Sequence, residues 1–202
     1  LSLDAVARRK RELQAPLKVI RSIERAQLNP DDQLSFDLFR KNCEQAVEGT
    51  RFPEEYFQIT QLNGLQQDLV RLLTIAPRAT VKDYENLIAR LNGVPVRMDQ
   101  TIALLKQGLA GGFTPPRITL RDVPQQVKNL MTADRQRNSL LESFRQFPAV
   151  IPGPQQARLR QEAEKALVEQ VIPALGRLHD FLVNQYLPGA CATIAMSDLP
   201  DG

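Results

Sequence analysis

The sequence predicts an all-α protein, a multi-helix antiparallel bundle or array with kinked long helices and little or no sheet. Three observations predict this fold class. Apolar residues recur at spacings of three and four, helix-starting and helix-ending residues separate these stretches, and no convincing alternating strand pattern occurs. Only residues 190–195 form a plausible short extended piece. Packing several long antiparallel helices together is the economical way to bury such faces.

The first two helices are predicted from residues 3–49. Apolar residues recur at helical intervals at Leu3, Val6, Leu13, Leu17, Ile20 and Ile23. Asn29 followed by Pro30 then marks a new helix, because asparagine caps helices and proline suits a first turn. We expect this helix to end near Gly49 and to turn four residues toward the core: Leu34, Leu38, Phe39 and Cys43.

The middle of the chain continues the helical pattern after an ordered, aromatic-rich connection at residues 51–64. A short helix begins near Leu65 and stops before Pro77, since the residue before proline avoids the α region. Thr80, with Asp83 three residues later, predicts a capping box. The following apolar pattern crosses residues 93–95, so either one kinked helix or two abutting helices would satisfy it.

The last third of the chain contains the longest pattern. A glycine and proline break at residues 108–116 precedes a helix near residues 123–131, and a proline-rich connection follows at residues 147–154. A helical stripe then runs from Leu159 to Tyr186. Pro173 should kink this helix, and the tail from Leu187 to Gly202 should not continue it.

The size and charge of the chain bound its class. Its 202 residues can bury a substantial core, and we expect a single helical domain over residues 1–202, with any subdivision near residues 111–118. No apolar stretch reaches the roughly 20 residues that a transmembrane helix needs. The net charge of +3 is too small to imply a polyanionic partner, and the basic run at residues 8–11 lacks interleaved aromatics. We therefore interpret that run as a solvated helix face, not a nucleic-acid site.

The sequence contains no residue that we assign as catalytic, cofactor-binding or metal-binding. His179 is the only histidine, and neither a His-Glu-x-x-His nor a Cys-x-x-Cys motif occurs. We interpret His179 as an ordinary surface or half-buried histidine and Asp180 as pointing elsewhere. Cys43 and Cys191 have no metal-ligand or disulfide spacing, so we expect both to be small residues of the core. A Cys191 nucleophile would require His179 and a third polar residue to converge on it.

Two further features have ordinary explanations. Glu162, Glu164 and Glu169 share a helix with arginine and lysine, so they are expected to form solvated charge pairs. The Gly111 and Gly112 pair with Arg117 lacks the spacing of a phosphate-binding loop, and helix termination explains it.

A family resemblance adds to this interpretation. Its residues extend from Leu73-Thr74 to Val127 and into the tail, and they include Asp83-Tyr84-Glu85-Asn86, Ala89-Arg90-Leu91, Met98-Asp99-Gln100, Gly108 to Pro116, Tyr186-Leu187-Pro188 and Leu199-Pro200-Asp201-Gly202. With these residues the chain resembles the bacterial domain-of-unknown-function family 885. The likeness covers most of the chain and is most specific between Tyr84 and Pro116.

The resemblance implies more than the residues show. Family members are typically much longer, many look exported or lipid-anchored, and they resemble zinc peptidases with a downstream His-Glu-x-x-Pro-Gly-His helix. This chain lacks that motif, so no zinc ligand carries over to it. The expectation is an N-terminal helical portion that lines a peptide-substrate cleft, beside a C-terminal catalytic part that holds zinc, in a periplasmic or cell-envelope lipoprotein.

The principal alternative is a noncatalytic helical module that binds a protein or peptide. The location of exposed apolar surface separates the two hypotheses. A patch formed by the last helix and the tail would fit a surface that the rest of a longer protein covers. A groove remote from both termini would favour the binding module.

Overall fold

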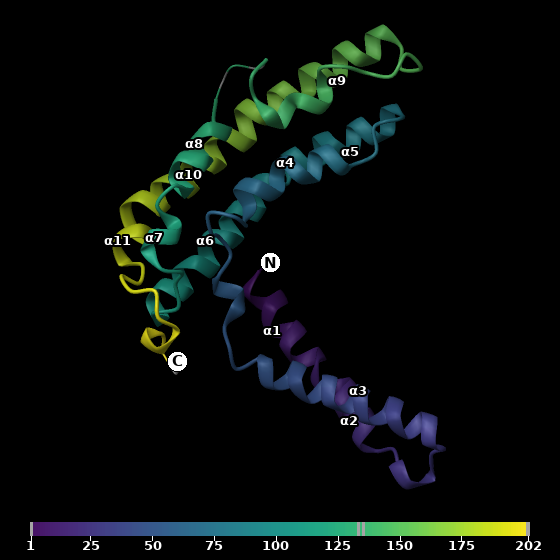
Figure 1. The fold of residues 1–202 in the computed structure, drawn as a ribbon. Coiled ribbons are helices and arrows are strands. Elements are labelled where there is room, and N and C mark those ends of the chain that lie inside the picture. Colours follow the sequence, from purple (N-terminus) through teal and green to yellow (C-terminus); the bar gives the residue numbers. More distant parts are fainter. Residues whose placement is uncertain (1, 133, 135, 201–202) are drawn as a thin grey trace. The chain divides into compact units, whose positions relative to one another are not determined.

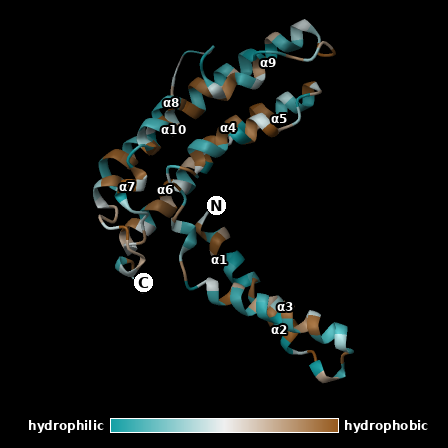
Figure 2. Cartoon of the chain, viewed as in Figure 1, coloured by the Kyte–Doolittle hydropathy of each residue, from teal (hydrophilic) through white to brown (hydrophobic). Residues whose placement is uncertain are grey.

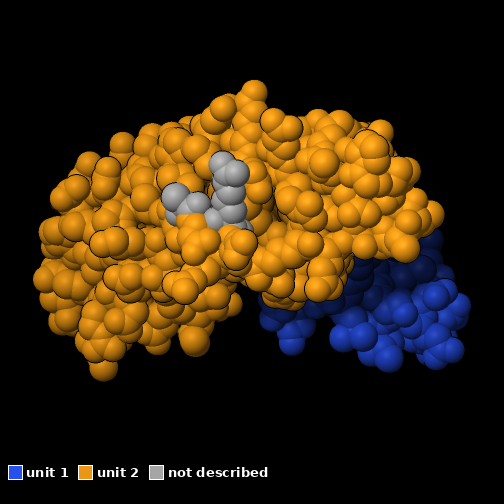
Figure 3. All heavy atoms as spheres, turned by 90° about the horizontal axis from the view of Figure 1, so that it is seen from above, with its two compact units in different colours: residues 1–55 blue, residues 56–202 orange. Residues whose placement is uncertain are grey.

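The computed structural model describes residues 2–132, 134 and 136–200. The chain divides into two compact units, residues 1–55 and residues 56–202 (Figure 3). This division differs from the predicted single domain with a subdivision near residues 111–118. That break lies inside the second unit, because Phe113 N–H donates to the Gly108 carbonyl and Arg117 N–H donates to the Cys191 carbonyl.

The first unit is a small set of helices. It contains α1 (Leu3–Glu12), α2 (Gln14–Arg21), η1 (Arg25–Gln27) and α3 (Pro30–Gly49). The predicted start and end of α3 are confirmed, and the Asn29 side chain accepts a hydrogen bond from Asp32 N–H at 2.9 Å. Helices α2 and α3 run antiparallel, because Arg25 binds Asp37 whereas Arg21, earlier in the chain, binds Glu44.

The predicted core face of α3 is wrong in part. Leu34, Leu38 and Phe39 are 63%, 56% and 50% exposed, whereas Phe36 and Cys43 are buried against Leu17 and Ile20 of α2. Phe36 and Cys43 are seven residues apart and therefore share one side of the helix. Leu34 and Leu38 are each two positions from Phe36, about 200° around the helix, so they lie on the opposite side.

The basic run of α1 is also less uniform than predicted. Arg8, Arg9 and Arg11 are exposed, as expected for a solvated face. Lys10 is half-buried, and its ammonium donates to the Thr50 carbonyl at 3.2 Å and to Glu55 at 2.6 Å. Since α1 has no buried residue, this pair is a principal contact that holds it to the end of the unit.

The second unit holds the larger core. Its helical elements, after η2 (Glu54–Tyr56), are α4 (Leu65–Ile75), α5 (Val81–Asn92), α6 (Val94–Gly111), α7 (Arg117–Leu120), α8 (Val123–Leu130), η3 (Ser139–Phe144), α9 (Gly153–Ala166), η4 (Leu167–Val171), α10 (Ile172–Phe181), η5 (Leu182–Tyr186), α11 (Leu187–Gly189) and η6 (Met196–Asp198). Hydrophobic residues are interspersed with hydrophilic ones along these helices (Figure 2). The all-α prediction is confirmed: among the described residues the β-type pairing is one isolated bridge, Ile59 with Gly64.

Two long helical stretches of this unit, α5–α6 and α9–α10, run parallel to each other, not antiparallel as predicted. Helix α5 packs on α9 and α6 packs on α10, in the same order along the chain. Glu85 meets Arg158, and Asp99, further along, meets Arg177. Residues 112–152 make this parallel arrangement possible, because they lead the chain back to the end of the unit where α5 begins.

The longest stretch, residues 153–189, contains two π-helical turns. Turn η4 ends at Val171, two residues before Pro173, and turn η5 ends at Tyr186, two residues before Pro188. Proline lacks an N–H and its ring clashes with the carbonyl four residues earlier, so a wider turn accommodates each proline. The helical ribbon follows a curved course (Figure 1). It also extends to Gly189, slightly beyond the predicted end at Tyr186.

Candidate functional site

The start of the tail after α11 is held by hydrogen bonds to residues more than 70 positions earlier in the chain. The Arg117 guanidinium donates to the carbonyls of Pro188 and Ala190 at 2.8 and 3.1 Å. Its backbone N–H donates to the Cys191 carbonyl at 2.7 Å, and Cys191 N–H donates to the Thr114 hydroxyl at 2.9 Å. The segment at residues 114–117 therefore holds the start of the tail.

A groove of about 360 Å³ lies beside this anchor, and we call it the tail groove. Its lining residues come from residues 57–62, 114–119 and 191–199, and each described lining residue is uncharged. Three large apolar side chains at the groove are strongly exposed: Leu62 at 75%, Ile194 at 78% and Met196 at 75%. The groove therefore offers apolar contact area with neutral hydroxyl and amide groups around it.

Cys191 lines this groove, whereas the sequence predicts a core position. Its thiol is 3.3 Å from the Thr193 hydroxyl, and the residue is half-buried. His179 contacts Asp180 instead, with Nδ1 3.4 Å from the carboxylate, although the sequence predicts that these neighbours diverge. No hydrogen bond joins Cys191 to His179 among the described residues. The arrangement that a cysteine nucleophile requires is therefore not formed, whereas Cys43 is buried as predicted.

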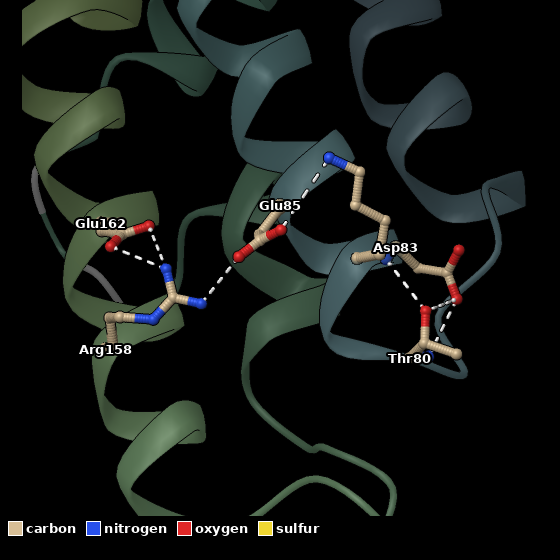
Figure 4. Close-up of polar contacts among 6 residues, drawn as sticks. Thr80, Asp83, Glu85, Arg158 and Glu162 are labelled. Carbon is tan, nitrogen blue, oxygen red and sulfur yellow. Dashed lines mark hydrogen bonds and ion pairs between the residues drawn. The ribbon is translucent and has the colours of Figure 1, made fainter.

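Charge pairs form along α9, and one of its arginines also links it to α5 (Figure 4). Arg158 binds Glu162 at 3.1 Å on its own helix and Glu85 of α5 at 2.9 Å. Glu169 lies 4.0 Å from Lys165. The predicted charge pairs are thus confirmed for Glu162 and Glu169. The sequence gives no sign of the Arg158–Glu85 pair, because the partners are 73 positions apart.

The start of α5 is fixed by the predicted capping box (Figure 4). The Thr80 hydroxyl accepts from Asp83 N–H, and the Asp83 carboxylate accepts from Thr80 N–H at 2.9 Å. These hydrogen bonds from Thr80 stabilise the ionised carboxylate and lower the pKa of Asp83 below its ordinary value.

The glycine and proline break has the predicted structural role. Gly112 adopts φ +78°, the left-handed conformation that ends α6. Arg117 is engaged with the tail carbonyls, so its hydrogen bonds serve the chain itself. These contacts explain the residues without a phosphate ligand.

In the part of the chain that the structure describes, no group of three or more histidine, cysteine, aspartate or glutamate side chains is arranged to hold a metal ion. Nor does any helix in that part combine the length and apolar character that a bilayer crossing requires.

Comparison with known proteins decides the family. The family described as "Bacterial protein of unknown function (DUF885)" matches residues 1–202. The chain belongs to this family. No curated protein sequence matches the chain. Membership in DUF885 confirms the resemblance carried by residues 83–116 and the tail. The tail groove therefore belongs to a member of DUF885, and the description of that family states no activity.

Proposed function

We propose that this chain is the N-terminal helical, cleft-forming portion of a bacterial zinc-dependent peptidase. In this proposal the chain supplies one wall of the substrate cleft, restricts access to the metal and contains no zinc ligand itself. A C-terminal catalytic part of the parent protein binds zinc, which polarises the peptide carbonyl and activates water. The parent is proposed to be an exported or cell-envelope protein.

The observation that carries the proposal is the DUF885 match over residues 1–202. The resemblance to this family implies longer proteins with a His-Glu-x-x-Pro-Gly-His helix downstream. The geometry is compatible with a supporting wall, because Glu85–Arg158 and Asp99–Arg177 link the parallel helices at two separate levels. Helices linked in this way can present a cleft surface in a fixed orientation.

A noncatalytic module that binds a protein or peptide is the second candidate function. The tail groove favours it in part, since residues 57–62 and 114–119 lie far from both ends of the chain. The third part of the lining is the tail itself, at residues 191–199. The groove is therefore neither formed by the last helix and the tail alone nor remote from both termini. Its location is compatible with both hypotheses.

Peptidase assays on the native gene product and on this chain would test the proposal. The native product should cleave peptides, lose activity with a zinc chelator and regain it when zinc is restored. The 202-residue chain should be inactive under the same conditions. A native product that binds zinc but leaves every peptide of a random-sequence mixture intact would contradict the proposal.

A further inference from the structure

Helix α3 of the first unit carries apolar side chains on two opposite sides. Phe36 and Cys43 are buried on the side that faces α2. On the other side, Leu34 and Leu38 are 63% and 56% exposed, and they lie about one turn apart. An amphipathic helix buries one apolar stripe against its own domain. The second stripe of α3 is therefore apolar surface that the first unit leaves uncovered.

Two opposite charges flank this outer stripe at equal spacings. Asp31 lies three residues before Leu34, and Lys41 lies three residues after Leu38. Spacings of three, four and three are those of the a and d positions of a coiled coil, so the four side chains follow one side of the helix. Asp31 and Lys41 are exposed, and no ion pair or side-chain hydrogen bond joins either of them to another described residue. We call these four residues the outer seam.

The outer seam is complementary to its own reversed copy. When a second α3 runs antiparallel and the two helices meet at the level of residue 36, Leu34 of each copy faces Leu38 of the other. Asp31 of each copy then faces Lys41 of the other, so the interface is the same on both sides, as two-fold symmetry requires. A parallel pair would instead place like charges opposite each other. The charges therefore select the antiparallel arrangement.

We propose that the outer seam binds a second copy of this chain, which gives an antiparallel, two-fold dimer with two leucine layers between two aspartate–lysine layers. The leucines supply the apolar area that becomes buried, whereas the exposed ion pairs set direction more than affinity. A single helix pair buries less than the roughly 1,200 Å² of a standard interface, so the dimer is expected to exchange with monomer. A second copy fits the seam because it carries the matching charges at the matching spacing.

The carboxylates beside the outer seam do not oppose this pairing. Asp37 is bound by Arg25 at 2.7 Å, and Glu44 is bound by Arg21 at 3.2 Å, so both are paired within the first unit. The dimer is also independent of the proposed peptidase, since pairing of two α3 helices requires neither zinc nor hydrolysis.

Sedimentation equilibrium of the 202-residue chain tests the dimer, over a concentration series that extends to about 1 mM. Leu38→Asp should weaken dimerisation at least about tenfold, equivalent to about 1.4 kcal/mol, because it places a charge in a leucine layer. Leu72→Asp is the matched control, since Leu72 lies on α4, is 48% exposed and is not part of the seam. It should dimerise like the unmodified chain. Circular dichroism of both variants checks that they fold alike.

Exchange of the two charges tests the antiparallel pairing. Asp31→Lys places two lysines in each end layer, and Lys41→Asp places two aspartates there. Each variant alone should therefore dimerise several-fold more weakly than the unmodified chain at low salt, where ion pairs are least screened. An equimolar mixture of the two variants should recover dimerisation, because each end layer then contains one lysine and one aspartate. A contact of the seam within its own chain would not be restored by mixing.

The expected result is a concentration-dependent dimer that Leu38→Asp weakens and Leu72→Asp does not, with recovery in the mixture of charge variants. A chain that stays monomeric throughout the series would overturn the assignment. Equal effects of the two leucine variants, or a mixture that dimerises no better than its components, would overturn it as well. The zinc content of the native gene product enters none of these outcomes, so failure of the proposed peptidase would leave the dimer result intact.

Discussion

Arg158 of α9 donates to Glu85 of α5 at 2.9 Å and to Glu162 of its own helix at 3.1 Å. One guanidinium thus joins two parallel helices and a carboxylate one turn away. The side chains of Arg158 and Glu85 are 38% and 37% exposed, so water screens their attraction. The pair is therefore expected to fix the relative register of the helices more than to supply stability.

Replacing Arg158 should destabilise the chain modestly. Arg158→Ala removes contacts to both carboxylates, whereas Lys165→Ala removes only the looser 4.0 Å pair with Glu169 on the same helix. Thermal unfolding followed by circular dichroism should show a lower Tm for Arg158→Ala than for Lys165→Ala. High salt should narrow the gap, because it screens exposed ion pairs. Equal Tm values at low salt would contradict the linking role.

The capping box at the start of α5 should contribute measurably to stability. Thr80→Ala removes the hydroxyl that accepts from Asp83 N–H, and a lost cap of this kind costs about 1 kcal/mol. Thr74→Ala is a suitable control, because the Thr74 hydroxyl donates to the Val70 carbonyl and caps no helix start. Urea unfolding should resolve a difference between the two variants. Equal unfolding midpoints would argue against the cap.

The same box predicts a pH dependence. Because Thr80 lowers the pKa of Asp83 in the folded chain, ionised Asp83 stabilises the fold above its unfolded pKa. This contribution is lost as pH falls through the folded pKa, below the ordinary aspartate value of about 3.9. Asp83→Asn should therefore be less stable than the unmodified chain at neutral pH, and the gap should close in acid. A gap that widens in acid would contradict the sign.

Replacing each of two helical glycines with alanine should change the stability of the chain in opposite directions. A Cβ at Gly108 would lie 2.6 Å from the Phe113 carbonyl oxygen and 2.7 Å from Tyr56 Cβ, so Gly108→Ala should destabilise by about 1–3 kcal/mol. At Gly176 the nearest atom is Met131 Cε at 3.7 Å, an ordinary contact. Gly176→Ala should stabilise by about 0.5–1 kcal/mol, because glycine is a poor helix former. Denaturant unfolding of both variants would test the contrast.

The hydroxyl of Tyr186 is fully buried and has no hydrogen-bond partner among the described residues. Burial also raises the pKa of this phenol, so the group is neutral at physiological pH. Tyr186→Phe should leave stability unchanged or raise it by on the order of 1 kcal/mol. Tyr84→Phe is the comparison, since the Tyr84 hydroxyl donates to the Gln146 carbonyl at 3.4 Å. A loss of stability for Tyr186→Phe alone would show that its hydroxyl is bound.

Local features of the fold could be predicted because a few neighbouring residues determine them. The Asn29 cap, the Thr80–Asp83 box and the Gly112 helix end each depend on contacts within four positions. Pro173 likewise marks an interruption that its missing N–H makes unavoidable. The π-turn that accommodates it was not predicted, since the sequence shows which hydrogen bond is lost but not how the helix adjusts.

Long-range features escaped prediction for an equally physical reason. The parallel order of α5–α6 and α9–α10 depends on where residues 112–152 return the chain, which periodicity does not reveal. Leu34 and Leu38 have the spacing of a core face, but only the partner helix decides that Phe36 and Cys43 are buried. The tail groove was missed because it forms from three separate segments and carries no motif.

The most direct test of the central claim is the zinc content of the native gene product, measured by elemental mass spectrometry beside its intact mass. We predict a product longer than 202 residues that holds zinc in its downstream part, whereas the 202-residue chain binds none. A native product no longer than this chain, without zinc or peptidase activity, would contradict it. The helical binding module would then be the better description of this DUF885 protein.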